Sequence, residues 1–307
     1  MDKEQDINRR KILKRMALVG SGTLLPGVMV AEKENVFEKR KKSLRIAHIT
    51  DVHIRPEENA PARFGKCISE IKKHDIDFFL NGGDSIFAAD YSDITRERVN
   101  IQWDIWNAAR KQFSEYEMYS CLGNHDMWWA APNKKDTMYG KGYAIKQLNM
   151  PSAYYSFDKS GWHFIVLDSN NDGGGALGKE QLQWLNDDLD SISKETPVLV
   201  MSHYPILSAS THAVGGNHKD SLSITKVFHK HADKNIHCIS GHVHLFDTAM
   251  YNNVNYYCNG AMSGFWWGEG DEDSAGKYWY HQTPPGYTII DLYENGTLEN
   301  KYHPHKY

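Results

Sequence analysis

The chain has 307 residues, of which 40% are hydrophobic and 24% charged, enough apolar sequence for one large α/β domain or two small ones. The first 31 residues hold six Lys or Arg against three Asp or Glu, so the remainder carries −7 within a total of −4. An acidic body of this kind disfavours a long nucleic acid as partner, because such polymers require basic grooves. Small phosphorylated substrates stay possible, since bound metal ions can reverse the local field.

Residues 1–31 predict an export signal. A basic segment, Asn8–Lys14, precedes a mildly apolar run from Met16 to Val30, and the paired Arg9 and Arg10 resemble the twin-arginine type. The run would form only about 22 Å of helix, which predicts no stable membrane span. A basic amphipathic helix of the mature protein is the alternative, which the glycines and proline of the run disfavour. We therefore expect the export machinery as a partner and a periplasmic or extracellular location. Residues 32–43 are interpreted as a linker.

The domain expected over residues 44–307 alternates strands and helices. Helical patterns cover residues 62–74, 93–113, 138–148 and 178–189, and the second places Val99, Ile101, Ile105 and Trp106 on one face. An antiparallel pair is expected across the turn 158–161, and hairpins are expected at residues 252–253 and 294–296. Alternating elements followed by a strand-rich end predict an α/β fold, a sandwich of two mixed β-sheets flanked by helices.

Five short motifs follow strand-like runs at residues 44–50, 77–82, 118–123, 198–202 and 236–240. In α/β proteins the carboxyl ends of strands converge on one crevice, so these motifs predict one site. A single Asp-x-His or Gly-Asp pair has little specificity, but the ordered set is highly specific. The motifs are Asp51-Val52-His53, Gly83-Asp84, Gly123-Asn124-His125-Asp126, Ser202-His203-Tyr204 and Gly241-His242-Val243-His244.

The side chains of these motifs suit a pair of metal ions. Carboxylate, amide and imidazole ligands together favour Mn, Fe or Zn over Ca or Mg, which prefer oxygen alone. Two divalent or mixed-valence ions can clamp a phosphoryl group and activate a water for in-line attack, and the carboxylate of Asp84 is a candidate bridge. His125 is positioned to protonate the leaving oxygen, and we expect Asp126 to orient its imidazole.

The ordered motifs resemble the calcineurin-like metallophosphoesterase superfamily, from Leu44 to at least His244. The resemblance implies that one ion is held by Asp51, His53, Asp84 and His244, and the other by Asp84, Asn124, His203 and His242, with His125 as the catalytic histidine. The segment that follows Asp84 is Ser85-Ile86-Phe87, which lacks the tyrosine ligand typical of purple acid phosphatases. The tyrosinate–iron variant is therefore not expected.

The sequence leaves the substrate open. The absence of an arginine obviously placed for a phosphomonoester favours a phosphodiester, with a phosphomonoesterase and an inactive binding protein on the same fold as alternatives. Trp128-Trp129 and Phe265-Trp266-Trp267 are interpreted equally well as a stacking rim or as packing. His212 and His218 are expected at the surface. Cys121, Cys238 and Cys258 are expected to be buried and free, with a Cys238–Cys258 bridge as the alternative.

Overall fold

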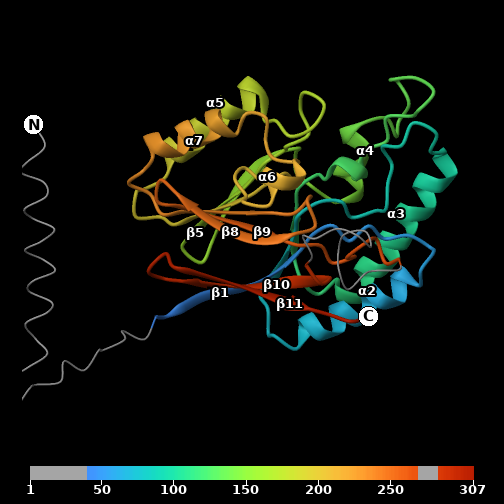
Figure 1. The fold of residues 1–307 in the computed structure, drawn as a ribbon, viewed down its shortest axis with the longest axis horizontal. Helices are drawn as coiled ribbons and strands as arrows, with labels where there is room; N and C mark the ends of the chain where they lie inside the picture. The colour runs from blue at the N-terminus through green and yellow to red at the C-terminus, as the bar shows by residue number, and fades with distance from the viewer. Residues whose placement is uncertain (1–39, 269–282) are drawn as a thin grey trace, which may run out of the picture. The chain divides into compact units, whose positions relative to one another are not determined.

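The computed structural model describes residues 40–268 and 283–307. The export signal predicted over 1–31 and nearly all of the linker lie outside these residues. Two mixed sheets form the centre of the domain (Figure 1). The five-stranded sheet has the order β11 (Leu298–Pro304), β10 (Gly286–Tyr293), β1 (Lys42–Ile49), β2 (Phe78–Asn81), β3 (Met118–Ser120). The six-stranded sheet has the order β4 (Tyr155–Lys159), β5 (Trp162–Val166), β6 (Val198–Met201), β7 (Ile236–Ser240), β9 (Val254–Asn259), β8 (Phe246–Tyr251).

Each sheet combines parallel and antiparallel strands. Strands β1, β2 and β3 are parallel, as are β5, β6, β7 and β9, whereas β10, β11, β4 and β8 pair antiparallel with their neighbours. The carboxyl ends of the parallel strands of a sheet lie at one edge, so the loops that follow them can share a crevice.

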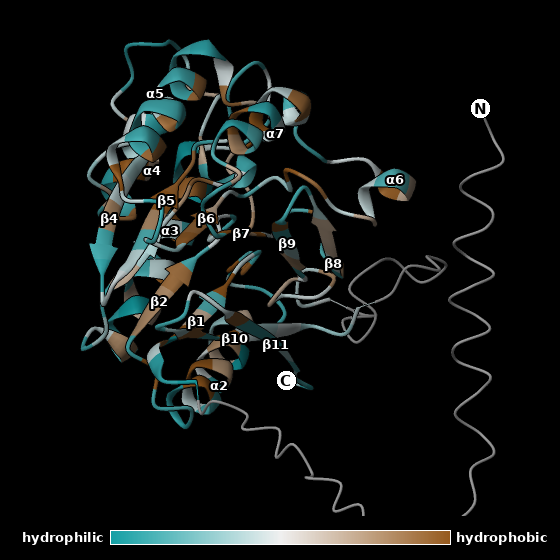
Figure 2. Ribbon diagram, turned by 90° about the vertical axis from the view of Figure 1, so that its left-hand side faces the viewer, coloured by the Kyte–Doolittle hydropathy of each residue, from teal (hydrophilic) through white to brown (hydrophobic). Residues whose placement is uncertain are grey.

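Helices cover the outer faces of both sheets. The helices are α2 (Ala60–Lys72), α3 (Arg96–Arg110), α4 (Lys141–Gln147), α5 (Gly178–Ser191), α6 (Thr211–Val214) and α7 (Ser221–Lys230), with 3₁₀ turns at Lys111–Phe113 and Asn124–Asp126. Helices α2 and α3 pack on the five-stranded sheet, and α5 and α7 pack on the six-stranded sheet (Figure 1). A third apolar cluster, which includes Ile46, Phe78, Phe164 and Ile239, fills the space between the sheets. Apolar residues accordingly concentrate in central strands such as β2 and β5, whereas the outer helices are mixed (Figure 2).

The predicted α/β sandwich is confirmed, and each expected helix is present with shifted ends. The prediction of which residues form the buried face of α3 was partly wrong. Ile101 is 39% exposed, while Trp103 is buried beside Val99 and Trp106. Thr95 caps this helix by accepting a hydrogen bond from the Arg98 backbone N–H at 3.2 Å, which fixes the helix start.

The predicted turns are present, and the cysteines are buried and free as predicted. The β4–β5 turn has Ser160 and Gly161 at φ 50° and 82°, and the β8–β9 turn has Asn252 and Asn253 at φ 49° and 63°. Two consecutive left-handed residues match the right-handed twist of hairpin strands. All four cysteines are buried and free, so no Cys238–Cys258 bridge forms. Among the residues described, the structure contains no helix with the length and apolar character needed to cross a membrane.

Candidate metal centre

The predicted ligands lie together where β1, β2, β3, β6 and β7 end. Their donor atoms form three overlapping groups, each with all its atoms within 4.8 Å of one another. The groups are Asp51, His53 and His244; His53, Asp84 and His125; and Asp84, His203 and His242. Asn124 joins the last group, since its Oδ1 lies 3.1 Å from His203 Nε2. The structure therefore brings together all seven predicted ligands.

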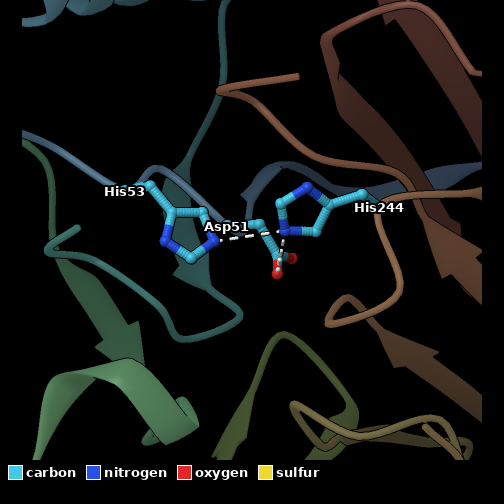
Figure 3. Close-up of side chains that lie close together, drawn as sticks. All are labelled: Asp51, His53 and His244. Carbon is cyan, nitrogen blue, oxygen red and sulfur yellow. Dashed lines mark hydrogen bonds and ion pairs between the residues drawn. The ribbon is translucent and has the colours of Figure 1, made fainter. Parts of the chain in front are cut away.

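Asp51, His53 and His244 make up one end of this cluster. Figure 3 shows the three side chains turned toward a common point. The Nε2 atoms of His53 and His244 are 3.1 Å apart, and His244 Nε2 is 3.3 Å from Asp51 Oδ1. Asp51 is held from behind by the Thr50 hydroxyl at 2.6 Å and by the His242 backbone N–H at 3.0 Å. Its carboxylate is thus fixed before any ligand binds.

Backbone carbonyls determine which nitrogen of three imidazoles faces the cluster. The Nδ1 atoms of His53, His203 and His244 lie 3.1, 2.7 and 2.9 Å from the carbonyl oxygens of Phe87, Gly82 and Gly264. A carbonyl only accepts, so each Nδ1 must donate, which leaves Nε2 to supply the lone pair in a neutral ring. Two such lone pairs 3.1 Å apart at His53 and His244 repel each other unless a cation lies between them.

Asp84 occupies the middle of the cluster. Its Oδ2 atom lies 3.2 Å from His203 Nε2 and 3.7 Å from His53 Nε2, and its Oδ1 accepts the His125 backbone N–H at 2.8 Å. At the far end, the ring of Tyr204 packs on that of His242 with centroids 3.8 Å apart. One carboxylate therefore connects two groups of imidazoles.

The backbone around the site is strained. Five of the seven predicted ligands, Asp51, His53, Asp84, His242 and His244, have φ between 45° and 70°. Non-glycine residues rarely adopt this conformation, which is unfavourable by about 1 kcal/mol or more each and concentrates at functional sites. Two glycines permit the close approach of the loops, since a Cβ at Gly123 would lie 2.0 Å from the Asp84 nitrogen and one at Gly241 would lie 2.2 Å from Asp51 Oδ2.

Burial and charge set the protonation of the site. Burial opposes the charged form of Asp51, but His244 outweighs it and lowers the pKa of Asp51 to about 2. Burial likewise opposes ionisation of Asp84, while His203 and His125 hold its pKa well below the ordinary value. Burial lowers the pKa of His53 and of His242 to about 3. Burial also lowers the pKa of His203, but Asp84 outweighs it and raises that pKa to about 9. Charged carboxylates and neutral imidazoles are the forms that bind metal ions, so a metal ion would displace a proton at His203.

His125 has a different partner from the one expected. Its Nδ1 lies 2.6 Å from Oδ1 of Asp90, whereas Asp126 accepts the backbone N–H groups of Gly123, Asp84 and Ser85 at 2.8, 3.0 and 2.8 Å. Asp126 thus fixes the two ligand-bearing loops to each other, and Asp90 orients the imidazole. Burial alone lowers the pKa of His125, but Asp84 and Asp90 together raise it to about 9. Asp90 belongs to no recognisable motif, so only the folded loop reveals it.

The structure also places the two loop histidines and the tryptophans singled out in the sequence. The expectation that His218 lies at the surface was wrong, because the side chain is fully buried between the Ser202 hydroxyl at 2.8 Å and Asp220 at 3.1 Å. His212 lies in the short helix α6, none of whose residues is buried, as expected of a surface residue. Trp128 and Trp267 are buried packing residues, whereas Trp129 is 42% exposed and Trp266 is half-buried.

The residues of the cluster fit two transition-metal ions. One group of donors is Asp51, His53 and His244, and another is Asp84, His203 and His242. Asp84 Oδ2 lies between them, 3.2 Å from His203 Nε2 and 3.7 Å from His53 Nε2. This donor chemistry suits Mn, Fe or Zn.

The sequence model of the calcineurin-like phosphoesterase family matches residues 44–246. The chain belongs to this family. Purple acid phosphatase 22 of Arabidopsis thaliana is 27% identical over 200 residues, covering 61% of this chain but only 42% of its own length. A 3',5'-cyclic-nucleotide phosphodiesterase of Nostoc is 24% identical over 274 residues, covering 85% of this chain and 92% of its own. Hence the chain spans less than half of the plant phosphatase and most of the diesterase.

Comparison of structures supports the same fold. A dimetal phosphatase from Danio rerio superposes with a TM-score of 0.62 at 14% identity, covering 83% of this chain and 94% of its own. Family membership and the donor set together make this a metal-dependent phosphoric ester hydrolase of the calcineurin-like type.

Proposed function

We propose that this calcineurin-like protein hydrolyses a phosphodiester, with Asp51, His53, Asp84 and His244 holding one metal ion and Asp84, Asn124, His203 and His242 holding the other. The observation that carries the proposal is the position of Asp84 Oδ2, within 3.2 Å of His203 Nε2 and 3.7 Å of His53 Nε2. Mn, Fe or Zn suits these ligands. When bound, such ions supply Lewis-acid activation of water and of the phosphoryl oxygens.

His125 is the proton donor in this proposal. Its Nδ1 is engaged by Asp90 at 2.6 Å, so Nε2 remains to deliver a proton to the leaving oxygen as the P–O bond breaks. The backbone N–H of the same residue binds Asp84, which ties the acid to the ligand shared by both ions. The hydroxyl from water ends on phosphorus, and the leaving group departs as an alcohol.

The charge that the site must neutralise favours a phosphodiester over a phosphomonoester as substrate. A monoester dianion carries one more charge to be neutralised, commonly by arginine or lysine. Lys141, at the start of α4, is already bound to Asp168 and Asn171 at 2.6 and 2.7 Å. The Nostoc relative, matched over 92% of its length, is named for a diesterase activity, whereas the plant relative is named for a phosphatase, which keeps the monoesterase as the second candidate.

Two chromogenic esters test the proposal. Metal-replete protein with added Mn should hydrolyse bis-p-nitrophenyl phosphate with a higher kcat/KM than p-nitrophenyl phosphate. The opposite preference would identify a monoesterase. Turnover of neither ester by protein that contains two metal ions per chain would favour a binding protein on the phosphoesterase fold.

We also propose that residues 1–31 direct export by the twin-arginine route, followed by a linker over 32–43 and the phosphoesterase domain over 44–307. The basic segment with Arg9 and Arg10 and the apolar run after it support this proposal. Such export would place the enzyme in the periplasm or outside the cell.

A further inference from the structure

Three aromatic rings border the end of the site that holds His53 and His125. The Trp266 ring lies 5.7 Å from that of His53 and 6.0 Å from that of His244, at interplanar angles of 76° and 86°. The Phe87 ring lies 6.1 Å from both Trp266 and Tyr91. Tyr91 lies 5.9 Å from His125. We call Tyr91, Phe87 and Trp266 the aromatic row.

Trp267 is a buried packing residue, whereas Trp266 stacks on Phe265 with ring centroids 5.3 Å apart and remains half-buried. Trp267 is 1% exposed, donates its indole N–H to the Val52 carbonyl at 2.7 Å and stacks on His305. Trp266 is half-buried, and its indole nitrogen has no acceptor among the residues that the structure describes. A buried donor without a partner is unfavourable, so the indole nitrogen of Trp266 adds nothing to the stability of this position.

The backbone is strained at both tryptophans. Trp266 has φ 55° and Trp267 has φ 65°, a left-handed conformation that bulky side chains rarely adopt. Strained residues persist where function requires a side chain in one place. At Trp266 the strain holds the indole beside two predicted metal ligands.

The other two residues of the aromatic row are Phe87, which is held by its neighbours, and Tyr91, which is accessible to solvent. The Arg55 guanidinium lies 4.7 Å from the centre of the Phe87 ring, and the Phe87 carbonyl accepts the His53 Nδ1–H. Tyr91 is 40% exposed although it touches His125, the proposed proton donor. An exposed aromatic side chain beside a reacting centre offers a surface on which a flat group can stack.

We propose that the aromatic row binds a flat aromatic group esterified to the phosphorus of the substrate, with Trp266 as the residue that determines this specificity. The substrate class is thus a phosphodiester bearing an aromatic ring, either a nucleoside or an aryl group. The inference rests on the proposed phosphodiesterase function and names the ester group that this site selects.

Binding of two phosphinates tests the row without turnover. Diphenylphosphinate and dimethylphosphinate carry the same single charge on a P–C framework that cannot be hydrolysed, and differ in their rings. Calorimetric titration of metal-replete protein should show tighter binding of the diphenyl compound. Trp266→Ala should weaken diphenylphosphinate binding roughly tenfold and leave dimethylphosphinate unchanged, whereas Trp266→Phe should retain most of the preference. Trp129→Ala removes another partly exposed tryptophan, which packs on Tyr139, and serves as the matched control.

The outcomes separate this inference from the proposed function. Equal affinity for the two phosphinates, or a preference lost in Trp129→Ala instead of Trp266→Ala, would overturn the role of the row. Failure to hydrolyse bis-p-nitrophenyl phosphate would overturn the function but not the phosphinate result. A nucleoside and an aryl group, the two possible bearers of the ring, are distinguished by comparing kcat/KM for p-nitrophenyl thymidine 5'-phosphate and methyl p-nitrophenyl phosphate. A gain in kcat/KM that depends on Trp266 assigns the ring to a nucleoside, and its absence assigns it to an aryl ester.

Discussion

Replacing Asp90 by Asn should slow diester hydrolysis roughly tenfold without loss of metal. The carboxylate accepts from His125 Nδ1 at 2.6 Å, and the two side chains are 27% and 16% exposed. A hydrogen bond to a charged group contributes about 1.5–3 kcal/mol, and about 1.4 kcal/mol corresponds to a factor of ten. Partial exposure and the oxygen that Asn retains place the expected effect at the lower end of that range.

The assay should report on proton donation rather than on folding. Phenol is a much weaker acid than p-nitrophenol, so a phenyl leaving group depends more on a general acid. We expect Asp90→Asn to reduce kcat for diphenyl phosphate more than for bis-p-nitrophenyl phosphate, and His125→Ala to show the same dependence with a larger loss. Asp93→Asn changes an exposed carboxylate three residues away and should have no effect.

Equal loss for both leaving groups in Asp90→Asn would refute the reasoning, because it would show that Asp90 does not act through the proton donor. Loss of metal from His125→Ala would instead make His125 a ligand. Metal content is therefore measured on every variant beside the rates.

Three further predictions concern the bridging ligand, a buried histidine and the amino terminus. Asp84→Asn should lower the content of both metal ions, as measured by elemental analysis, and an unchanged count would contradict its position between His53 and His203. Burial lowers the pKa of His163, but Asp188 at 2.9 Å and Asp158 at 2.8 Å outweigh it and raise that pKa. Its stabilisation is then complete below about pH 6.5 and lost as pH rises through the folded value. The loss in unfolding free energy caused by His163→Gln, from denaturant titration, should accordingly be larger at about pH 5.5 than at about pH 8.5. An equal loss at both values would assign His163 a packing role only. Changing Arg9 and Arg10 to Lys should retain the precursor in the cytoplasm, and normal export in a fractionation assay would point to the general secretory route.

The sequence was informative where side chains directly follow strands. Asp51 and His203 lie two residues beyond the ends of β1 and β6, and Asp84 lies three residues beyond the end of β2, so their meeting follows from sheet geometry alone. The hairpins at Ser160-Gly161 and Asn252-Asn253 were predictable for a similar reason, since turn chemistry is local.

Residues in loops were harder to predict because their direction depends on backbone reversals that no short pattern records. Asp126 follows His125 in sequence, yet its carboxylate points at backbone N–H groups, and the partner of His125 comes from 35 residues earlier. His218 was expected at the surface because it lies in a polar loop, but Ser202 and Asp220 enclose it. Val99 and Ile101 are two residues apart in α3, about 200° around the helix, so the two could not share its buried face.

The position of β1 determines when the site can form during synthesis. β1, which carries Asp51 and His53 at its end, lies between β2 and β10, and β10 begins only at Gly286. A nascent chain that has emerged as far as His244 contains every predicted ligand, yet one edge of β1 is still unpaired. β1 thus pairs along that edge only after β10 has been translated, about 240 residues later, and such long-range pairing is slow to form. We therefore expect metal loading to follow translation, in whichever compartment β10 docks on β1.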